Sequence, residues 1–212
     1  MILAKVVFAL TVFAVDIEEI FGHGKLMKPI SRASRWRDSR FADSERHYTD
    51  NQFFAEAYTR NNFKCGVCGD PYNEIAPRET ENGGRYGTGT IVETYKRGQR
   101  IAVTVSLDAN HGGYFKFAVC PLSENQPETE ECFRKYPLKF PDGSRLLPIK
   151  ESYRGKITVY VDLPKNLSCK HCSFRWHYRC GNNSHKCKDG VERRGCSLKQ
   201  EIFRGCADIS IL

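Results

Sequence analysis

Two histidines far apart in the sequence, His23 and His111, have the side chains best suited to chemistry. The chain begins with a short positive region and an apolar run over residues 6–15 that is too short to span a bilayer, which indicates a secretion signal over residues 1–22. Cleavage after Gly22 would give His23 a free α-amine beside its imidazole, and this pair of nitrogens can chelate copper. The alternative is that His23 is an ordinary residue near an imprecise cut, because the acidic segment before it is unusual for a cleavage region.

His111 lies in a turn, DANHGG, between two segments that alternate like strands. The two glycines after it allow the backbone to fold tightly. If the first strand ends at the same edge, the amine and ring of His23 and the ring of His111 would offer a metal three neutral nitrogens, a set that favours copper. Taken alone, His111 would be interpreted as a turn residue hydrogen-bonded to backbone.

The last apolar segment adds two residues to this expected metal centre. Strand alternation places Glu201 and Phe203 on one face. Phe203 under the metal would supply no ligand and would close that side to water, while Glu201 would orient the oxygen co-substrate. The competing interpretation is that Phe203 belongs to the core, as an inward phenylalanine in a final strand usually does.

Short alternating segments dominate the second half of the chain and would position these residues. Residues 31–85 show little alternation and are expected to form a long loop region, with a short helix within 43–58, and residues 184–196 are expected to form a basic loop. Little helix and many short strands indicate an all-β fold, an antiparallel β-sandwich. Strands are predicted near residues 25–30, 91–95, 101–107, 114–120, 157–161, 172–178 and 200–212.

All ten cysteines follow residue 22. An even number in a secreted chain predicts five disulfides, whose pairing the spacing does not decide. The alternative is a zinc site, because Cys65-x-x-Cys68 and Cys169-x-x-Cys172 are two CxxC pairs. A zinc ribbon expects about 15–20 residues between its pairs, whereas about a hundred intervene here, so we favour disulfides.

Length, net charge and the distribution of charged residues indicate the cellular compartment and the class of binding partner. The chain has 212 residues and a formal net charge of +8, and residues 23–212 suit a single domain without linker or repeat. Lys and Arg are scattered rather than gathered in one tract, so a polysaccharide matrix is the expected surrounding, with no nucleic acid and no membrane as partner. We expect a secreted, extracellular monomer, and sequons at Asn166 and Asn182 fit a secreted glycoprotein.

Four motifs together point to one family. They are the His-Gly start at His23, the Ala-x-His turn of residues 109–111 with Gly-x-Tyr-Phe after it, the CGVCGD of residues 65–70, and the QEIFRGCADISI of residues 200–211. With these motifs the chain resembles lytic polysaccharide monooxygenases, most of all auxiliary-activity family fifteen of arthropods and other eukaryotes. The resemblance covers residues 23–212. It implies an immunoglobulin-like or fibronectin type III-like β-sandwich with long disulfide-pinned loops and short helices.

The same resemblance implies the activity and the roles of the site residues. His23 and His111 would hold one copper ion in a histidine brace, Phe203 would take the axial position where some relatives have tyrosine, and Ala109 would shape access to the metal. The enzyme would use Cu(II)/Cu(I), an external electron donor, and O₂ or H₂O₂ to cleave β-1,4 bonds of crystalline polysaccharide by C1 or C4 hydroxylation. Chitin is favoured as substrate, with cellulose as the second choice.

Two other functions compete with this one. Glycoside hydrolysis needs two carboxylates about 5–10 Å apart, and no motif pairs acidic residues in that way. A secreted, non-catalytic module that binds chitin or another polysaccharide would share the fold and lack the metal. The His-Gly start, the Ala-x-His turn and the Glu-x-Phe strand favour the enzyme, because a pure binder has no need of all three.

Overall fold

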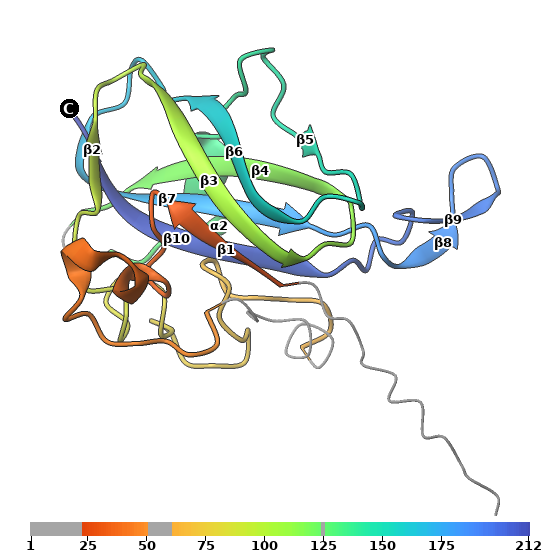
Figure 1. Ribbon diagram of the computed structural model, residues 1–212, viewed down its shortest axis with the longest axis horizontal. Coiled ribbons are helices and arrows are strands. Elements are labelled where there is room, and N and C mark those ends of the chain that lie inside the picture. Colours follow the sequence, from red (N-terminus) through yellow and green to blue (C-terminus); the bar gives the residue numbers. More distant parts are fainter. Residues whose placement is uncertain (1–22, 51–60, 124–125) are drawn as a thin grey trace, which may run out of the picture.

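The computed structural model describes residues 23–50, 61–123 and 126–212, so the expected signal over residues 1–22 lies outside the described residues. Two main sheets form a β-sandwich, and a short hairpin projects beside them (Figure 1). The strands are β1 (His23–Lys28), β2 (Glu93–Tyr95), β3 (Arg100–Ala109), β4 (Tyr114–Pro121), β5 (Leu147–Pro148), β6 (Gly155–Asp162), β7 (Cys169–Arg179), β8 (Ser184–Lys186), β9 (Glu192–Arg194) and β10 (Ile202–Ile211). The described helices are the 3₁₀ turns η1 (Arg35–Arg37) and η2 (Ser39–Phe41) and the short α2 (Glu130–Lys135).

The predicted antiparallel sandwich is confirmed, with one exception. One sheet has the order β1-β3-β6 and the other β2-β10-β7-β4-β5. All the pairings within these two sheets are antiparallel except that of β2 with β10, which is parallel. No helix within the described ranges is long and apolar enough to cross a membrane.

The core lies between the two sheets and follows from the alternation in the sequence. In β3, Ile101, Val103 and Val105 are each at most 2 % exposed, while the residues between them are partly exposed. Aromatic residues of the other sheet face them, with Phe117 and Trp176 nearly fully buried. Burying each such side chain contributes roughly 1.5–3 kcal/mol, so the sandwich is a rigid base for the loops at its ends.

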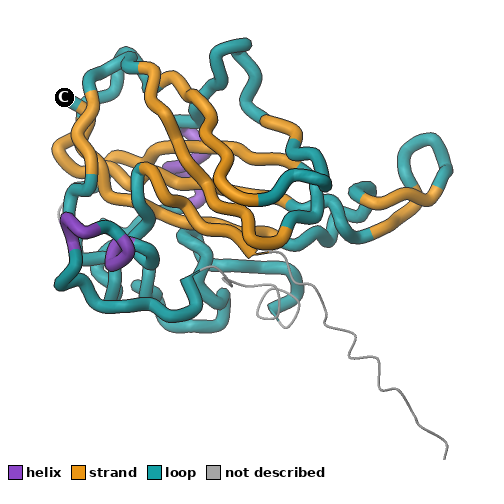
Figure 2. The backbone as a smooth tube through the Cα atoms, viewed as in Figure 1, coloured by secondary structure: helices purple, strands orange, loops and turns teal. Residues whose placement is uncertain are grey.

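The loop region between β1 and β2 lies against one side of the sandwich (Figure 2). The helix predicted within residues 43–58 is wrong for residues 43–50, which form turns, and residues 51–58 lie outside the described part. Residues 184–196 form the β8–β9 hairpin rather than an irregular loop, because the disulfide between Cys187 and Cys196 closes it. The sequence analysis also missed α2, which Thr129 caps by accepting a hydrogen bond from the Cys132 N–H.

The prediction of five disulfides is wrong by one. The structure pairs Cys68 with Cys206, Cys120 with Cys132, Cys169 with Cys172, and Cys187 with Cys196. Cys65 and Cys180 are free thiols in separate environments: charged groups surround Cys65, whereas Cys180 lies beside Tyr178 and Glu201. An even count does not reveal which thiols are neighbours. Both CxxC motifs contribute to disulfides, so they form no zinc ribbon.

Candidate metal centre

Strand β1 brings His23 to the turn that carries His111. The antiparallel register of β1 and β3 sets His23 opposite Ala109, two residues before His111. The side chain of His23 lies outside the part of the chain that the structure describes, so the register places its backbone alone. Gly24 lets β1 approach β3 closely, because a Cβ there would lie 2.8 Å from Cδ2 of Leu107.

Asn110 anchors the turn between β3 and β4. Its side chain is buried, and its amide nitrogen donates to the carbonyl oxygens of Lys150 at 2.8 Å and Tyr153 at 2.9 Å. Its amide oxygen accepts from the Gly112 N–H at 2.9 Å and from the Tyr178 hydroxyl at 2.8 Å. With these partners the buried amide is well satisfied, which fixes the backbone just before His111.

The glycines after His111 are required by local geometry. Gly113 has φ +91°, and a Cβ there would stand 2.0 Å from the carbonyl oxygen of Arg179. Only glycine tolerates both conditions. The tight fold predicted from the two glycines is therefore confirmed, and it presses the turn against the end of β7.

The backbone of His111 is fixed by hydrogen bonds, whereas Nε2 of its imidazole has no hydrogen-bond partner among the described residues. Its backbone N–H donates to the Tyr178 hydroxyl at 3.1 Å, and its carbonyl accepts from the Gly181 N–H at 3.1 Å. Nε2 of the ring is buried and has no hydrogen-bond partner among the described residues. Oε2 of Glu201 lies 3.8 Å from Nε2 and is likewise buried and unpartnered within those ranges.

Unpartnered buried nitrogen and oxygen atoms cost free energy, and a bound group would remove that cost. A neutral imidazole nitrogen is a good copper ligand, and a second set of nitrogens on His23 would come from the strand opposite. The residues present therefore fit copper. The structure places His111 beside Glu201 and sets the backbone of His23 opposite Ala109 in the neighbouring strand.

Phe203 packs against Tyr178, the residue whose hydroxyl contacts the His111 turn. It is 1 % exposed and lies opposite Tyr178 in the register of β10 and β7. The two rings stack with centroids 5.8 Å apart. Burial raises the pKa of the Tyr178 hydroxyl above its ordinary value, so this hydroxyl stays neutral while it bridges Asn110 and the His111 N–H.

Three supporting residues were not predicted from the sequence: Asn110, Tyr178 and Gln200. Gln200 is fully buried. Its side-chain amide accepts a hydrogen bond from the Asn183 N–H at 2.9 Å and donates one to the Asn183 carbonyl at 2.7 Å. These two bonds connect the base of the β8–β9 hairpin to the segment before Glu201. The only signal in the sequence was for Asn110, since asparagine in a turn often bonds the N–H two residues later.

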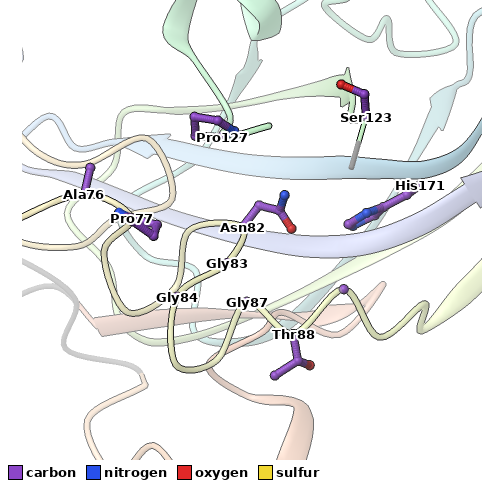
Figure 3. A pocket seen from close by; sticks show the side chains of 11 residues that line it. Ala76, Pro77, Asn82, Gly83, Gly84, Gly87, Thr88, Ser123, Pro127 and His171 are labelled. Atoms are coloured by element: carbon purple, nitrogen blue, oxygen red, sulfur yellow. The ribbon is translucent and has the colours of Figure 1, made fainter. Parts of the chain in front are cut away.

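A cavity of about 790 Å³ lies at the other end of β7, away from the proposed metal centre (Figure 3). The glycine-rich segment 82–89 contributes much of its lining, and His171 closes one side. His171 is near the first residue of β7, whereas Tyr178 is near the last, so the strand separates the two places. Among the side chains that the structure describes, none predicted for the metal centre lines this cavity.

Comparison with known proteins identifies what the chain is similar to. A family model described as "Lytic polysaccharide mono-oxygenase, cellulose-degrading" matches residues 23–209. The fold is similar to that of the lytic polysaccharide monooxygenase AA15 from Thermobia domestica in the Cu(I) state, with 37 % sequence identity and a TM-score of 0.83, covering 89 % of this chain and 98 % of that one. Among curated proteins, no match to the chain was found.

Two weaker similarities were also found. A cellulose-active lytic polysaccharide monooxygenase, CelS2, in complex with copper has 14 % identity and a TM-score of 0.44, with coverage of 89 % of this chain and 98 % of that one. A chitin binding domain from Burkholderia pseudomallei has 16 % identity and a TM-score of 0.48, with coverage of 91 % and 100 %.

Proposed function

The chain belongs to the lytic polysaccharide monooxygenases, which are copper enzymes, and we propose that it hydroxylates C1 or C4 of β-1,4 bonds in insoluble polysaccharide. The family match over residues 23–209 and the 37 % identity to an AA15 member carry the coarser statement, oxidative cleavage of polysaccharide with copper. The resemblance to family fifteen supports chitin as the preferred polymer, and cellulose is the alternative.

The observation that carries the site assignment is the buried Nε2 of His111, for which the described part of the chain supplies no hydrogen-bond partner. In our proposal this nitrogen binds one copper ion together with the α-amine and imidazole of His23, which cleavage after Gly22 would release. The pairing of His23 with Ala109 supports this, because it sets the start of β1 beside the turn. Copper would supply the redox chemistry, with an external electron donor and with O₂ or H₂O₂ as co-substrate.

The neighbouring residues would position that chemistry. Phe203 excludes water from one side, and Ala109 keeps the approach to the metal open. Glu201 carries Oε2 3.8 Å from the His111 ring, where it can hold a proton or orient the co-substrate. Asn110 and Tyr178 keep the turn rigid, so that a bond of the polymer and the imidazole keep a fixed mutual geometry.

We also propose that residues 1–22 are a removable signal and that the mature enzyme is a secreted monomer acting on crystalline polymer. The four disulfides support an oxidising compartment, where such bonds persist. The exposed Asn166 suits glycosylation better than Asn182, which is partly buried.

The test incubates the copper-loaded mature protein with β-chitin and with cellulose in the presence of ascorbate. We expect mass spectrometry to find aldonic-acid or 4-keto oligosaccharides, with more product from chitin. His111→Ala should abolish these products. His111 lies in a turn, and its Nε2 makes no hydrogen bond to any described residue. The melting temperature of the variant should therefore stay close to that of the metal-free parent.

Lys96→Met serves as the matched control, because Lys96 is an exposed residue in the turn between β2 and β3. This variant should keep full activity. If neither polymer yields oxidised products with copper, reductant and peroxide, the chain is a non-catalytic binding module. Reducing ends without oxidised products would instead indicate a hydrolase.

A further inference from the structure

The outer face of the five-stranded sheet carries a band of basic side chains on the side away from the core. The strand registers place Lys116 of β4, His177 of β7 and Arg204 of β10 in one row across the sheet. Arg175 lies two residues before His177 and shares its face. These residues alternate along the strands with core residues such as Trp176. The band therefore lies on the outer face of the sheet, and the core lies on its inner face.

A cavity of about 550 Å³ opens over this band. Four of its lining residues are cationic and one is acidic, so positive charge is in clear excess. The lining consists of Lys116, Phe117, Ala118, Glu130, Phe133, Arg134, Pro137, Arg145, Leu146, Arg175 and His177.

One carboxylate, that of Glu130, accepts hydrogen bonds from two buried guanidinium groups, of which Arg175 lines the cavity and Arg204 is its neighbour across the strands. Oε1 of Glu130 accepts from Nη1 of Arg175 at 3.0 Å and from Nη1 of Arg204 at 2.6 Å. The two arginine side chains are only 5 % and 11 % exposed, so water screens them poorly. Glu130 therefore compensates part of the charge and leaves the remaining cations without a counterion among the lining residues.

The titration behaviour of the band agrees with this excess. Burial, and then the charges of Arg175 and Arg204, lower the pKa of Lys116. Burial and the neighbouring Arg204 lower the pKa of Arg175 to about 10. Both shifts have the sign expected for cations that lack water and sufficient anionic partners, and an anion in the cavity would reverse them.

His177 adds a neutral donor to the same wall. Its Nδ1 accepts a hydrogen bond from Nε of Arg204 at 3.0 Å, which places the ring proton on Nε2. Burial and the surrounding cations lower the pKa of His177 well below its ordinary value, so the ring stays neutral. The residue lines the cavity, and an oxyanion there could accept from Nε2–H while Lys116 and the arginines supply charge.

We propose that this cavity binds a dianionic tetrahedral oxyanion, phosphate or sulfate, either free or as the monoester end of an organic molecule. Charge-assisted hydrogen bonds from Lys116 and the arginines would hold the anion. Pro137 and the exposed Leu146 offer apolar contact to the organic part of a monoester. The site lies on the opposite face of the sheet from Tyr178 and Phe203, so the proposal is independent of the copper chemistry.

Calorimetric titration of the copper-loaded mature protein tests this directly. The ligands are sodium phosphate, sodium sulfate and phenyl phosphate, each at constant ionic strength set with sodium chloride. We expect one anion per chain and a rise in melting temperature with phosphate. Tighter binding of phenyl phosphate than of phosphate would identify a monoester as the ligand, and equal or weaker binding would identify the free anion.

The double variant Lys116→Met/Arg145→Gln removes two of the cations. It should fold, because it relieves repulsion among like charges, and its affinity for phosphate should fall at least about tenfold. Lys96→Met, which removes a distant exposed cation, should bind as the parent does. The proposal is overturned if the parent binds no phosphate at millimolar concentration, if the control loses as much affinity as the double variant, or if binding disappears in metal-free protein.

Discussion

At the scale of single residues, the site is defined by which polar atoms have partners. The side chain of Asn110 makes four hydrogen bonds, whereas Nε2 of His111 and Oε2 of Glu201, both buried, make none among the described residues. Native proteins satisfy nearly all buried polar atoms, and these two lie only 3.8 Å apart, so in our proposal one bound metal with its co-substrate would satisfy both. In our proposal Asn110 fixes the backbone and the adjacent His111 offers its ring nitrogen to the metal, which is the support that rigid metal binding needs.

A second residue, Asp70 of the loop region, is expected to make the stability of the protein depend on pH. It is fully buried, and Thr80 donates to both of its carboxylate oxygens through its N–H at 2.8 Å and its hydroxyl at 2.5 Å. Burial and the nearby Glu81 nevertheless raise the pKa of Asp70 from 3.8 to about 6. The folded state then binds more protons than the unfolded state between these pH values, so stability falls as pH rises through that window.

Asp70→Asn should therefore increase the free energy of unfolding at pH 7 by about 2 kcal/mol, after allowance for one altered hydrogen bond to Thr80. The gain should vanish near pH 4, where Asp70 is protonated in the folded protein. Urea unfolding of parent and variant at both pH values measures this. Asp38→Asn is the control with the opposite sign, because Arg40 lowers the pKa of Asp38. A difference between Asp70→Asn and parent that does not change with pH would contradict the assignment.

At the scale of elements, alternation predicts strands well and predicts their connections poorly. β3 and β4 have nearly the predicted bounds, because one face of each packs on the core. The β8–β9 hairpin has no buried residue in either strand, so the sequence contains no hydrophobic pattern that predicts it. The six-residue α2 is too short for a periodic signal. A hydrophobic pattern predicts only elements that bury one face, so it predicts neither a hairpin closed by a disulfide nor a short helix defined by its cap.

The lengths of the loops closed by the disulfides predict how much each bond stabilises the fold. Cys68 and Cys206 are 138 residues apart and join the loop region to β10, whereas Cys120 and Cys132 are 12 residues apart. Because a longer closed loop removes more entropy from the unfolded chain, replacing the first pair by alanine should cost about 5 kcal/mol and replacing the second about 3 kcal/mol. Urea unfolding at neutral pH measures both. An equal or smaller loss for the first pair would show that strain or residual unfolded structure outweighs loop entropy.

At the scale of the whole molecule, the site that we propose joins three distant parts of the chain at one end of the sandwich. His23 begins β1, His111 follows β3, and Glu201 precedes β10. The sequence predicted these residues because their types suit the chemistry, and it predicted that the strands could bring them together. It did not predict Tyr178 and Gln200 as supports, because their contacts join residues whose proximity exists only in the folded sheet. The disulfide partners were unpredictable for the same reason.

The final prediction concerns the start of the mature chain. If the α-amine of His23 is a copper ligand, a protease-cleavable leader placed before His23 converts that amine into an amide and moves it out of reach. Copper affinity measured by calorimetry should then fall by more than the 10–100-fold typical for loss of an outer-shell partner, because a direct ligand is lost. Cleavage of the leader should restore both affinity and oxidative activity in the same sample, which excludes misfolding as the cause. Equal copper affinity before and after cleavage would show that His23 does not bind through its amine, and the three-nitrogen centre would have to be abandoned.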